Sequence, residues 1–261
     1  MGNGGVSTSP PPTLAEQEAI AGALSDADAL IDSLERLIAK KRAIKQGAMQ
    51  ELLTGKRRLP GFTGKWEVKP LSEVCQKIQD GTHFSPELGG NDYLYVTSKN
   101  IRFGILDMST AERISATEHY KIYGRCDVRK GDLLLTKDGA NTGNAALNPL
   151  DEPFSLLSSV AMLRFDGRLH SSAYFMYQIL SALGQAQIKE AMSGNAITRL
   201  TLQKIRALRF AAAPLPEQTA IATVLTDMDT EIAALDAKLA KARAIKHGMM
   251  HNLLTGRIRL I

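Results

Sequence analysis

Two stretches of the chain are close copies of each other. Residues 14–59 read LAEQEAIAGALSDADALIDSLERLIAKKRAIKQGAMQELLTGKRRL, and residues 215–260 read LPEQTAIATVLTDMDTEIAALDAKLAKARAIKHGMMHNLLTGRIRL. They align without a gap, and about half of the aligned positions hold the same residue. Self-similarity over this length indicates a repeated structural unit. The repeat therefore divides the chain into two matching arms and the segment between them.

Each copy is predicted to form one long helix. Its apolar residues recur at alternating steps of four and three, which is the spacing of the buried seam of a coiled coil. The predicted seam residues are Ile20, Leu24, Ala27, Ile31, Leu34, Leu37 and Ile38 in the first copy and Ile221, Leu225, Met228, Ile232, Leu235 and Leu239 in the second. After the basic segments 40–45 and 241–246 we expect the seam to resume in a shifted register, at Ile44, Ala48 and Leu52 in the first copy and at Ile245, Met249 and Leu253 in the second.

The ends of both helices carry typical signals. Thr13 and Glu16 form a capping box before the first helix, and Pro216 stands in the first turn of the second, where its missing N–H costs nothing. Gly55 and Gly256 supply C-terminal glycines. A single amphipathic helix of about 60 Å cannot cover its own seam, so the two copies are predicted to pack on each other. Antiparallel packing about a pseudo-twofold axis is the simplest arrangement, although the pattern also fits parallel packing.

The segment between the copies has a different pattern. Short runs of strand-forming residues, separated by glycine turns, occur at 66–68, 93–97, 132–136, 158–165 and 208–212, and helices are expected at 171–192 and 201–207. The predicted fold class is α+β: a mixed α/β domain flanked by two long helices packed as an antiparallel coiled coil. The predicted divisions are a disordered lead at 1–12, a first arm at 13–59, the domain at 60–213 and a second arm at 214–261.

Composition narrows the class of protein. The net charge of +5 weakly favours a polyanionic partner, and the two cysteines are too few for a disulfide framework, which points to the cytoplasm. No apolar run approaches the ~20 residues needed to cross a bilayer. The sequence also lacks a phosphate-binding loop, a glycine-rich dinucleotide or adenosylmethionine loop, and an amino-methyltransferase tetrapeptide. We therefore expect no catalytic residues.

His247 and His251 are candidate metal ligands, because histidines four residues apart lie on the same face of a helix. The first copy has Gln46 and Gln50 at the equivalent positions, and Gly248 stands where a metalloprotease motif has glutamate. No metal is expected.

The chain resembles the specificity subunits (HsdS) of type I restriction-modification systems. The resemblance is carried by PLPEQ at 214–218, the two LLTG tails, the entry at 66–74, DGTH at 80–83, residues 95–101 and KGDLLL at 130–135. It implies a target-recognition domain that reads one half of a bipartite site on double-stranded DNA. It also implies modification and restriction subunits as partners, which would carry S-adenosylmethionine, ATP and magnesium. The family has two recognition domains and this chain has one, so the chain is interpreted either as the distal half of a longer subunit or as a natural half-subunit. In either case self-association would restore two domains, and we expect it as a further property.

Polar loops of the central segment are the predicted DNA contacts, because base edges are read by hydrogen-bonding side chains and phosphates are bound by Lys and Arg. The alternative for each loop is a solvated turn, and the alternative for the whole domain is an adaptor that binds protein. For the basic segments of the arms, the default interpretation is solvated helix charges, and the alternatives are contacts to the DNA backbone or docking of modification subunits. The candidate DNA-binding residues are Gln79, Thr82, His83, Lys99, Asn100, Arg102, Lys137, Asn141, Thr142, Asn144, Asn195 and Arg199.

Overall fold

The computed structural model describes residues 11–192 and 199–260. The predicted disordered lead therefore falls almost entirely outside the described residues. The chain forms two compact units: a helical unit made of residues up to Gln46 and from Thr226 onward, and a globular unit from Gly47 to Leu225.

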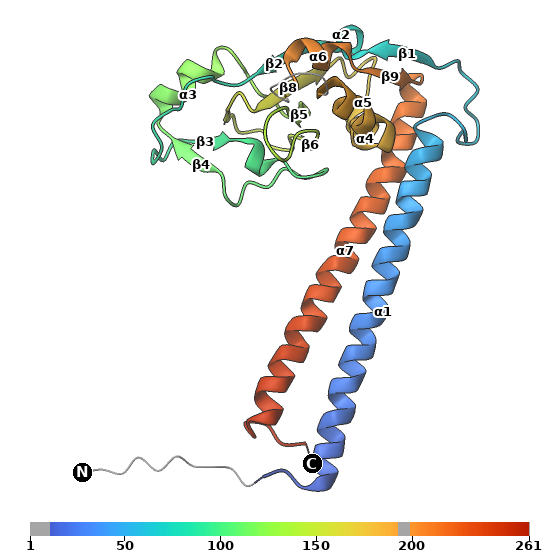
Figure 1. Cartoon of the computed structure of the whole chain (residues 1–261), viewed down its shortest axis with the longest axis vertical. Coiled ribbons are helices and arrows are strands. Elements are labelled where there is room, and N and C mark those ends of the chain that lie inside the picture. Colours follow the sequence, from blue (N-terminus) through green and yellow to red (C-terminus); the bar gives the residue numbers. More distant parts are fainter. Residues whose placement is uncertain (1–10, 193–198, 261) are drawn as a thin grey trace. The chain divides into compact units, whose positions relative to one another are not determined.

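The two repeat copies form the long helices α1 (Leu14–Leu52) and α7 (Leu215–Leu254), which lie side by side (Figure 1). Ion pairs between them join residues early in one helix to residues late in the other, so the helices are antiparallel, as predicted. Ile20, Ile38, Ile232 and Leu239 are all less than 10% exposed and lie in the seam. The repeat thus becomes a two-stranded coiled coil.

The ion pairs between the arms repeat at the offset that relates the two copies, which is 201 residues (215 − 14). Arg42 binds Asp236 at 2.9 Å, and its counterpart Arg243 binds Glu35. In the same way Lys45 pairs with Asp229, and Lys246 pairs with Asp28. Since each contact recurs with the roles of the helices exchanged, the contacts obey the predicted pseudo-twofold symmetry.

The predicted shift of the seam at the basic segments is wrong at Ile44 and Ile245, although Leu52 and Leu253, which were predicted further along the seam, are buried at 5% and 7% exposure. Ile44 and Ile245 are 47% and 51% exposed, whereas the side chains of Lys45 and Lys246 are only 18% and 27% exposed. The original register continues, and the lysines take seam positions because an aspartate of the opposite helix neutralises each of them. Lys and Arg side chains can cover apolar surface with their methylene stems while their charge remains paired or solvated.

The helix ends follow the predicted signals. The backbone N–H of Glu16 donates to Thr13 Oγ1 at 3.3 Å, as in a capping box. Gly55 and Gly256 have φ of 70° and 69°, the left-handed conformation that glycine adopts without strain. Both tails therefore turn in the same way after their helices.

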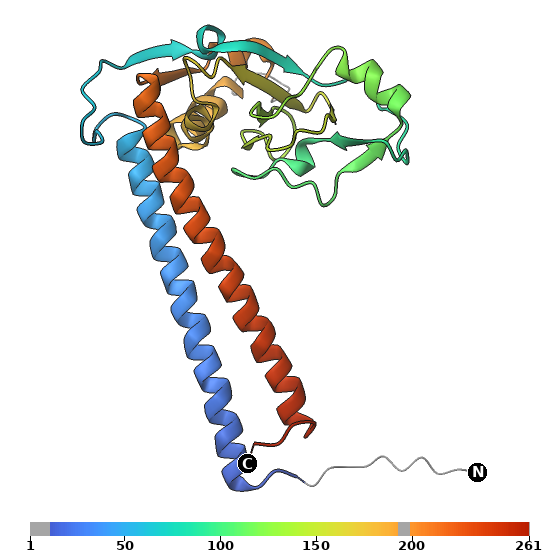
Figure 2. The same ribbon diagram turned by 180° about the vertical axis from the view of Figure 1, so that it is seen from behind.

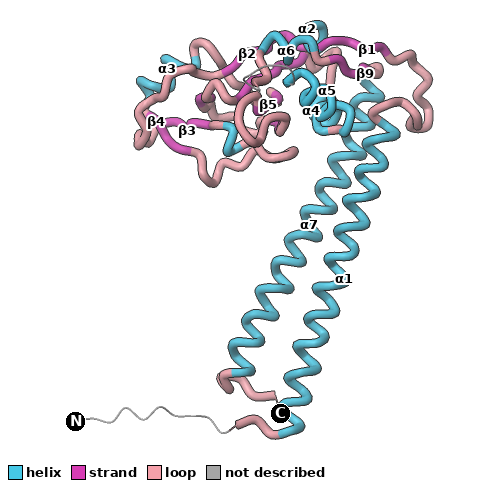
Figure 3. Tube along the Cα trace, viewed as in Figure 1, coloured by secondary structure: helices cyan, strands magenta, loops and turns pink. Residues whose placement is uncertain are grey.

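The globular unit is built around three small sheets (Figure 3). A two-stranded antiparallel sheet joins β1 (Glu67–Pro70) to β9 (Arg209–Ala212). The central sheet has the order β2-β8-β5-β6 and is antiparallel throughout; its strands are β2 (Cys75–Asp80), β8 (Val160–Phe165), β5 (Leu133–Thr136) and β6 (Ala145–Leu147). The third has the order β4-β3-β7; its strands are β4 (Glu112–Ile114), β3 (Tyr93–Val96) and β7 (Ser155–Leu156).

Short helices cover and connect these sheets. They are α2 (Leu71–Val74), α3 (Ala116–Tyr123), α4 (Ser172–Leu180), α5 (Ala182–Met192) and α6 (Leu202–Ala207), with the 3-10 helix η1 (Ser98–Asn100). In both views of the globule, α3 and the third sheet lie at one end and the β1–β9 pair at the other (Figures 1 and 2). A core of Val96, Ile101, Leu134, Phe154 and Met162 lies between the second and third sheets.

Five predicted strands and the 201–207 helix are present, but the single helix expected at 171–192 is two helices. The backbone of Ser181 is extended, and its hydroxyl accepts from the N–H of Gly184 at 3.1 Å, which starts α5 afresh. The prediction also missed β2, β4, β6, β7, α2 and α3. Most of these are too short to show a period in the sequence.

Candidate nucleic-acid interface

The polar loops predicted from the sequence meet in the globule. Ser159 bonds two of them: its hydroxyl accepts from Ser98 N at 3.2 Å, and its carbonyl accepts from Lys137 N at 2.9 Å. Asn144 Nδ2 donates to Ile101 O at 3.2 Å, which ties the same two loops a second time. We call the segments 79–85, 97–105 and 136–144, with Arg199, the loop cluster.

A chain of ion pairs joins segment 79–85 and Arg199 to segment 136–144. Lys137 Nζ lies 3.4 Å from Asp80 and 3.3 Å from Asp138, and Asp138 in turn binds Arg199 at 2.9 Å. Asp80 also accepts from Arg125 at 3.0 Å. The carboxylates of Asp80 and Asp138 therefore fix segments that lie far apart in the sequence.

The predicted contact residues fall into distinct classes of exposure. His83, Lys99, Arg102, Asn141 and Arg199 are exposed, and Gln79, Thr142 and Asn144 are partly exposed. Thr82, Asn100 and Lys137 are buried. Asn195 lies outside the described residues. The exposed set carries three cations and one amide, which suits binding to phosphate and to base edges.

The buried members have structural partners. Asn100 accepts from Thr97 N at 3.0 Å and donates to Asp107 O at 3.1 Å, so it shapes its own loop. Thr82 accepts from Phe84 N in a turn. The Lys137 side chain is 8% exposed and neutralised by two carboxylates. This burial argues against base reading by Asn100 and against phosphate contact by Lys137.

Phe103 is a surface residue that sequence reasoning missed. It stands at a loop tip and is 54% exposed, and Ile105 beside it is 62% exposed. Hydrogen bonds from Arg102 N to Ile105 O and from Gly104 N to Ala145 O, both 2.9 Å, hold the tip. Apolar side chains at such tips contact thymine methyl groups or enter base steps. The sequence does show an apolar residue on each side of Gly104, directly after the candidate contact residue Arg102.

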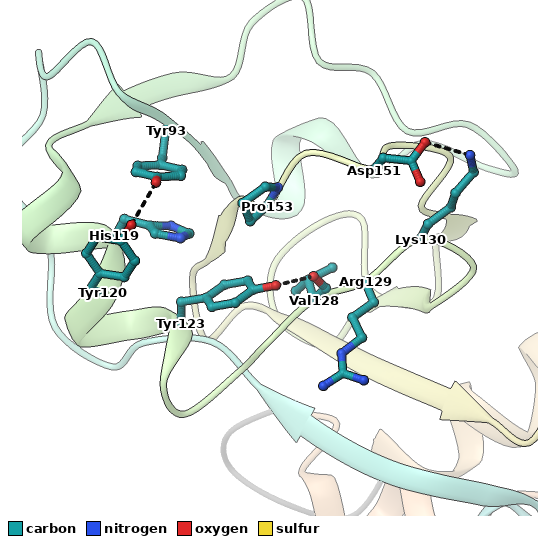
Figure 4. A pocket seen from close by; sticks show the side chains of 9 residues that line it. All are labelled: Tyr93, His119, Tyr120, Tyr123, Val128, Arg129, Lys130, Asp151 and Pro153. Carbon is teal, nitrogen blue, oxygen red and sulfur yellow. Dashed lines mark hydrogen bonds and ion pairs between the residues drawn. The ribbon is translucent and has the colours of Figure 1, made fainter.

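Figure 4 shows an aromatic pocket of about 420 Å³. Its lining comes in part from α3 and β3, which lie at the other end of the globule from β1 and β9 (Figure 1). Tyr93, Tyr120 and Tyr123 line it together with His119, and Arg129 is among the residues at its edge. The His119 ring stacks on Tyr93 with 3.7 Å between ring centroids, and its Nδ1 lies 2.9 Å from Ser155 Oγ. The hydroxyls of Tyr93 and Tyr120 are hydrogen-bonded to each other at 3.0 Å. The tyrosines of the pocket come from β3 and α3, and α3 was not predicted.

Burial lowers the pKa of His119, and burial with the nearby Lys69 lowers the pKa of His170. Both imidazoles are therefore harder to protonate in the folded chain than in the unfolded chain, where their ordinary pKa is about 6.5. Below that pH the unfolded state binds more protons, so the stability that is complete above it is lost as the pH falls from there towards the lower pKa of the folded chain. We expect urea midpoints to fall between pH 7 and pH 5.

His119→Phe should flatten this pH dependence, and the exposed His83 provides the control as His83→Phe. Urea titrations at several pH values measure both effects. An equal slope in the His119 variant and the parent would contradict the assignment.

The cysteines have the character of small buried residues. Burial raises the pKa of the Cys126 thiol to about 12 and also raises that of Cys75, which disfavours the reactive thiolate. Within residues 11–192 and 199–260, no group of three or more His, Cys, Asp or Glu side chains is placed to hold a metal ion. His251 instead lies 2.8 Å from Arg257.

No helix among the described residues is both long and apolar enough to traverse a bilayer.

Paired antiparallel arms that carry one α/β globule with clustered polar loops define a class of DNA-specificity protein. The family model for the type I restriction modification DNA specificity domain matches residues 63–242, and the chain belongs to this family. It is thus a member of the type I restriction-modification specificity subunit family, as the resemblance of its sequence motifs had indicated.

Relatives support the assignment over nearly the full chain. The type I restriction enzyme MjaVIII specificity subunit of Methanocaldococcus jannaschii is 25% identical over 96% of this chain. Crystal structures of the S subunit from M. genitalium and of the HsdS subunit from Thermoanaerobacter tengcongensis share the fold, with TM-scores of 0.63 and 0.58 at 16% and 17% identity. They match 92% and 95% of this chain. The chain spans 62%, 61% and 60% of these three proteins.

Proposed function

We propose that the chain is a sequence-reading, non-catalytic subunit that holds one half of a bipartite site on double-stranded DNA through the loop cluster. The observation that carries the proposal is the joining of loops from distant parts of the sequence into one surface with exposed Lys99, Arg102 and Arg199. Rigidly placed cations fix the register on the phosphates, and neighbouring amides and apolar groups then meet base edges.

Base reading is assigned to Asn141, which is exposed, and to the Phe103 tip. Asn hydrogen bonds to adenine, and an apolar ring favours a thymine methyl group. Thr142 and Asn144 each donate a side-chain hydrogen bond within the chain, Thr142 to Gly139 O and Asn144 to Ile101 O. Their side-chain oxygens are the groups that we assign to contact with DNA.

Family membership supports a proposal about the partners. We propose that modification and restriction subunits assemble with the chain in the cytoplasm and that they hold S-adenosylmethionine, ATP and magnesium. This chain would supply the recognition of the DNA word and the spacing set by its coiled coil.

The salt dependence of DNA binding tests which cations touch phosphate. The plot of log K against log [salt] has a negative slope, and Lys99→Ala should make it less steep by roughly one unit, because one phosphate contact is lost. Lys137→Met should weaken binding at every salt concentration, because it leaves Asp80 and Asp138 without their shared partner, but it should leave that slope unchanged, because the buried ammonium contacts no phosphate. The complex with modification subunits is titrated into labelled duplex DNA. A slope change for Lys137→Met without one for Lys99→Ala would reverse the assignment.

A further inference from the structure

The carboxylate of Asp80 binds three basic side chains at once. Arg125 Nη2 donates to its Oδ1 at 3.0 Å, while His83 Nε2 and Lys137 Nζ lie 3.3 Å and 3.4 Å from its Oδ2. His83 and Lys137 belong to segments of the loop cluster. Arg125 comes from the connection between α3 and β5, which lies outside the loop cluster. The carboxylate therefore ties a further segment of the chain to the predicted DNA contacts.

The negative charges of this network are buried, and its positive charges are exposed. The carboxylates of Asp80 and Asp138 are 4% and 17% exposed. The side chains of Arg125 and Arg199 are 50% and 61% exposed. With the buried Lys137, three basic side chains stand against two carboxylates, which leaves one positive charge even when His83 is neutral. A ligand that arrives from solvent meets the arginines first, and this favours an anion.

The guanidinium of Arg125 has donors to spare. It carries five N–H groups. Among the described residues only its Nη2 has a side-chain partner, Asp80, so Nε and Nη1 remain available to a ligand. Arg164 is the contrast, because all three of its nitrogens bind Asp127 or Asp132 and its side chain is 16% exposed. The fold thus occupies Arg164 completely and holds Arg125 by one nitrogen.

The ion pair with Asp80 brings Arg125 to the end of the central sheet where the loop cluster lies. Asp80 is the last residue of β2 and pairs with Ala161, near the start of β8. Thr136 is the last residue of β5 and pairs with Val160, the first residue of β8. Segments 79–85 and 136–144 therefore leave the sheet at the same end, and the α3–β5 connection joins them there.

We propose that Arg125 binds a phosphate of the DNA backbone and that Asp80 is the positioning residue that holds Arg125 for this contact. The proposal rests on the proposed function and adds the α3–β5 connection to the DNA-binding surface. The planar fork of guanidinium N–H groups matches the oxygens of a phosphate. Lys137 neutralises Asp80 from the buried side, so the carboxylate repels the phosphate less.

The salt dependence of DNA binding by the complex with modification subunits tests the contact. Arg125→Ala should weaken binding about tenfold, which is the order expected for one charge-assisted contact. It should also make the slope of log K against the logarithm of salt concentration less steep by roughly one unit, whereas Arg125→Lys should keep the slope of the parent. An unchanged slope in Arg125→Ala would overturn the proposal.

Arg168→Ala is the matched control, because it removes another exposed arginine that pairs with an aspartate. Arg168 binds Asp166 at 2.7 Å just beyond the far end of β8, about 17 Å along the strand from the loop cluster. It should leave both the affinity and the slope close to those of the parent. A loss equal to that of Arg125→Ala would show that any surface arginine has this effect and would overturn the assignment to Arg125.

Lys99→Ala in the same titration separates this proposal from the proposed function. A less steep slope for Lys99→Ala, with an unchanged slope for Arg125→Ala, would overturn the contact of Arg125 alone. Binding by the parent complex that does not depend on salt would overturn the loop cluster as the DNA-binding surface, and the contact of Arg125 with it.

A double-mutant cycle tests the role of Asp80. If Asp80 acts through Arg125, Asp80→Asn should weaken DNA binding in the parent and have a much smaller effect when Arg125 is already alanine. Urea midpoints measured in parallel report the stability of each variant. Equal losses of affinity in the two backgrounds would show that Asp80 only supports the fold and would overturn its positioning role.

Chemical modification gives a measurement that needs no substitution. Phenylglyoxal modifies arginine side chains, and mass spectrometry then reports the rate at each position in the complex with and without duplex DNA. DNA should slow the modification of Arg125 at least fivefold and leave that of Arg168 unchanged. Equal rates at Arg125 with and without bound DNA would overturn the contact.

Discussion

Glu217→Ala should destabilise the globular unit by about 3 kcal/mol, because removing one partner of a buried ion pair leaves the other without compensation. Glu217 has no exposed surface and accepts from both Arg58 and Trp66. The guanidinium of Arg58 lies over the Trp66 ring, 5.2 Å from its centroid, so the loss of the carboxylate also frees this stack. Urea unfolding followed by circular dichroism measures the change.

Glu16→Ala is the matched control for this substitution. Glu16 makes the equivalent pair with Arg259, but no indole donates to it in the described residues. We expect a smaller loss of stability than for Glu217→Ala. If the two variants lost the same stability, the hydrogen bond from Trp66 to Glu217 would contribute nothing to stability.

Gly81→Ala is expected to cost about 3 kcal/mol or more, because overpacking against the backbone forces the chain to move. A Cβ at this position would stand 1.9 Å from the carbonyl oxygen of Leu156. The neighbouring Thr82 N–H donates to the same oxygen at 2.8 Å, so the strain would also displace segment 79–85 of the loop cluster. We therefore expect weaker DNA binding by the assembled complex as well as a lower urea midpoint.

Gly167→Ala serves as the control, because nothing lies within 4 Å of the position that its Cβ would take. It should leave both the midpoint and DNA binding close to those of the parent. A Gly81→Ala variant as stable as Gly167→Ala would show that β7 can move away from β2 at little cost.

The arms were predictable because their information is local and repeated. A seven-residue pattern continued over about 40 residues leaves few alternatives to a long helix, and the second copy supplied the partner for the seam. The prediction at Ile44 was wrong because a lysine at a seam position interrupts the apolar pattern, so the sequence suggests that the seam ends or shifts there. Only the opposite helix, with Asp229 placed beside Lys45, shows that the position is occupied and neutralised.

The loop cluster was predictable only as a set of polar segments. Which residues are exposed depends on partners from elsewhere in the chain, such as Asp80 for Lys137 and Asp107 for Asn100. The same is true of Arg125, whose pairing with Asp80 no local pattern indicates. Sequence reasoning finds where hydrogen-bonding groups gather, and the fold decides which of them remain available to a ligand.

Selection from a random duplex library by the complex with modification subunits tests DNA reading by the loop cluster most directly. The parent should enrich one bipartite word, and Asn141→Ala should relax that word at a single base position while Lys99→Ala weakens binding to every sequence alike. Enrichment of the same word, with the same preference at every position, after substitution of Asn141, Phe103 and Arg199 together would contradict recognition by this surface.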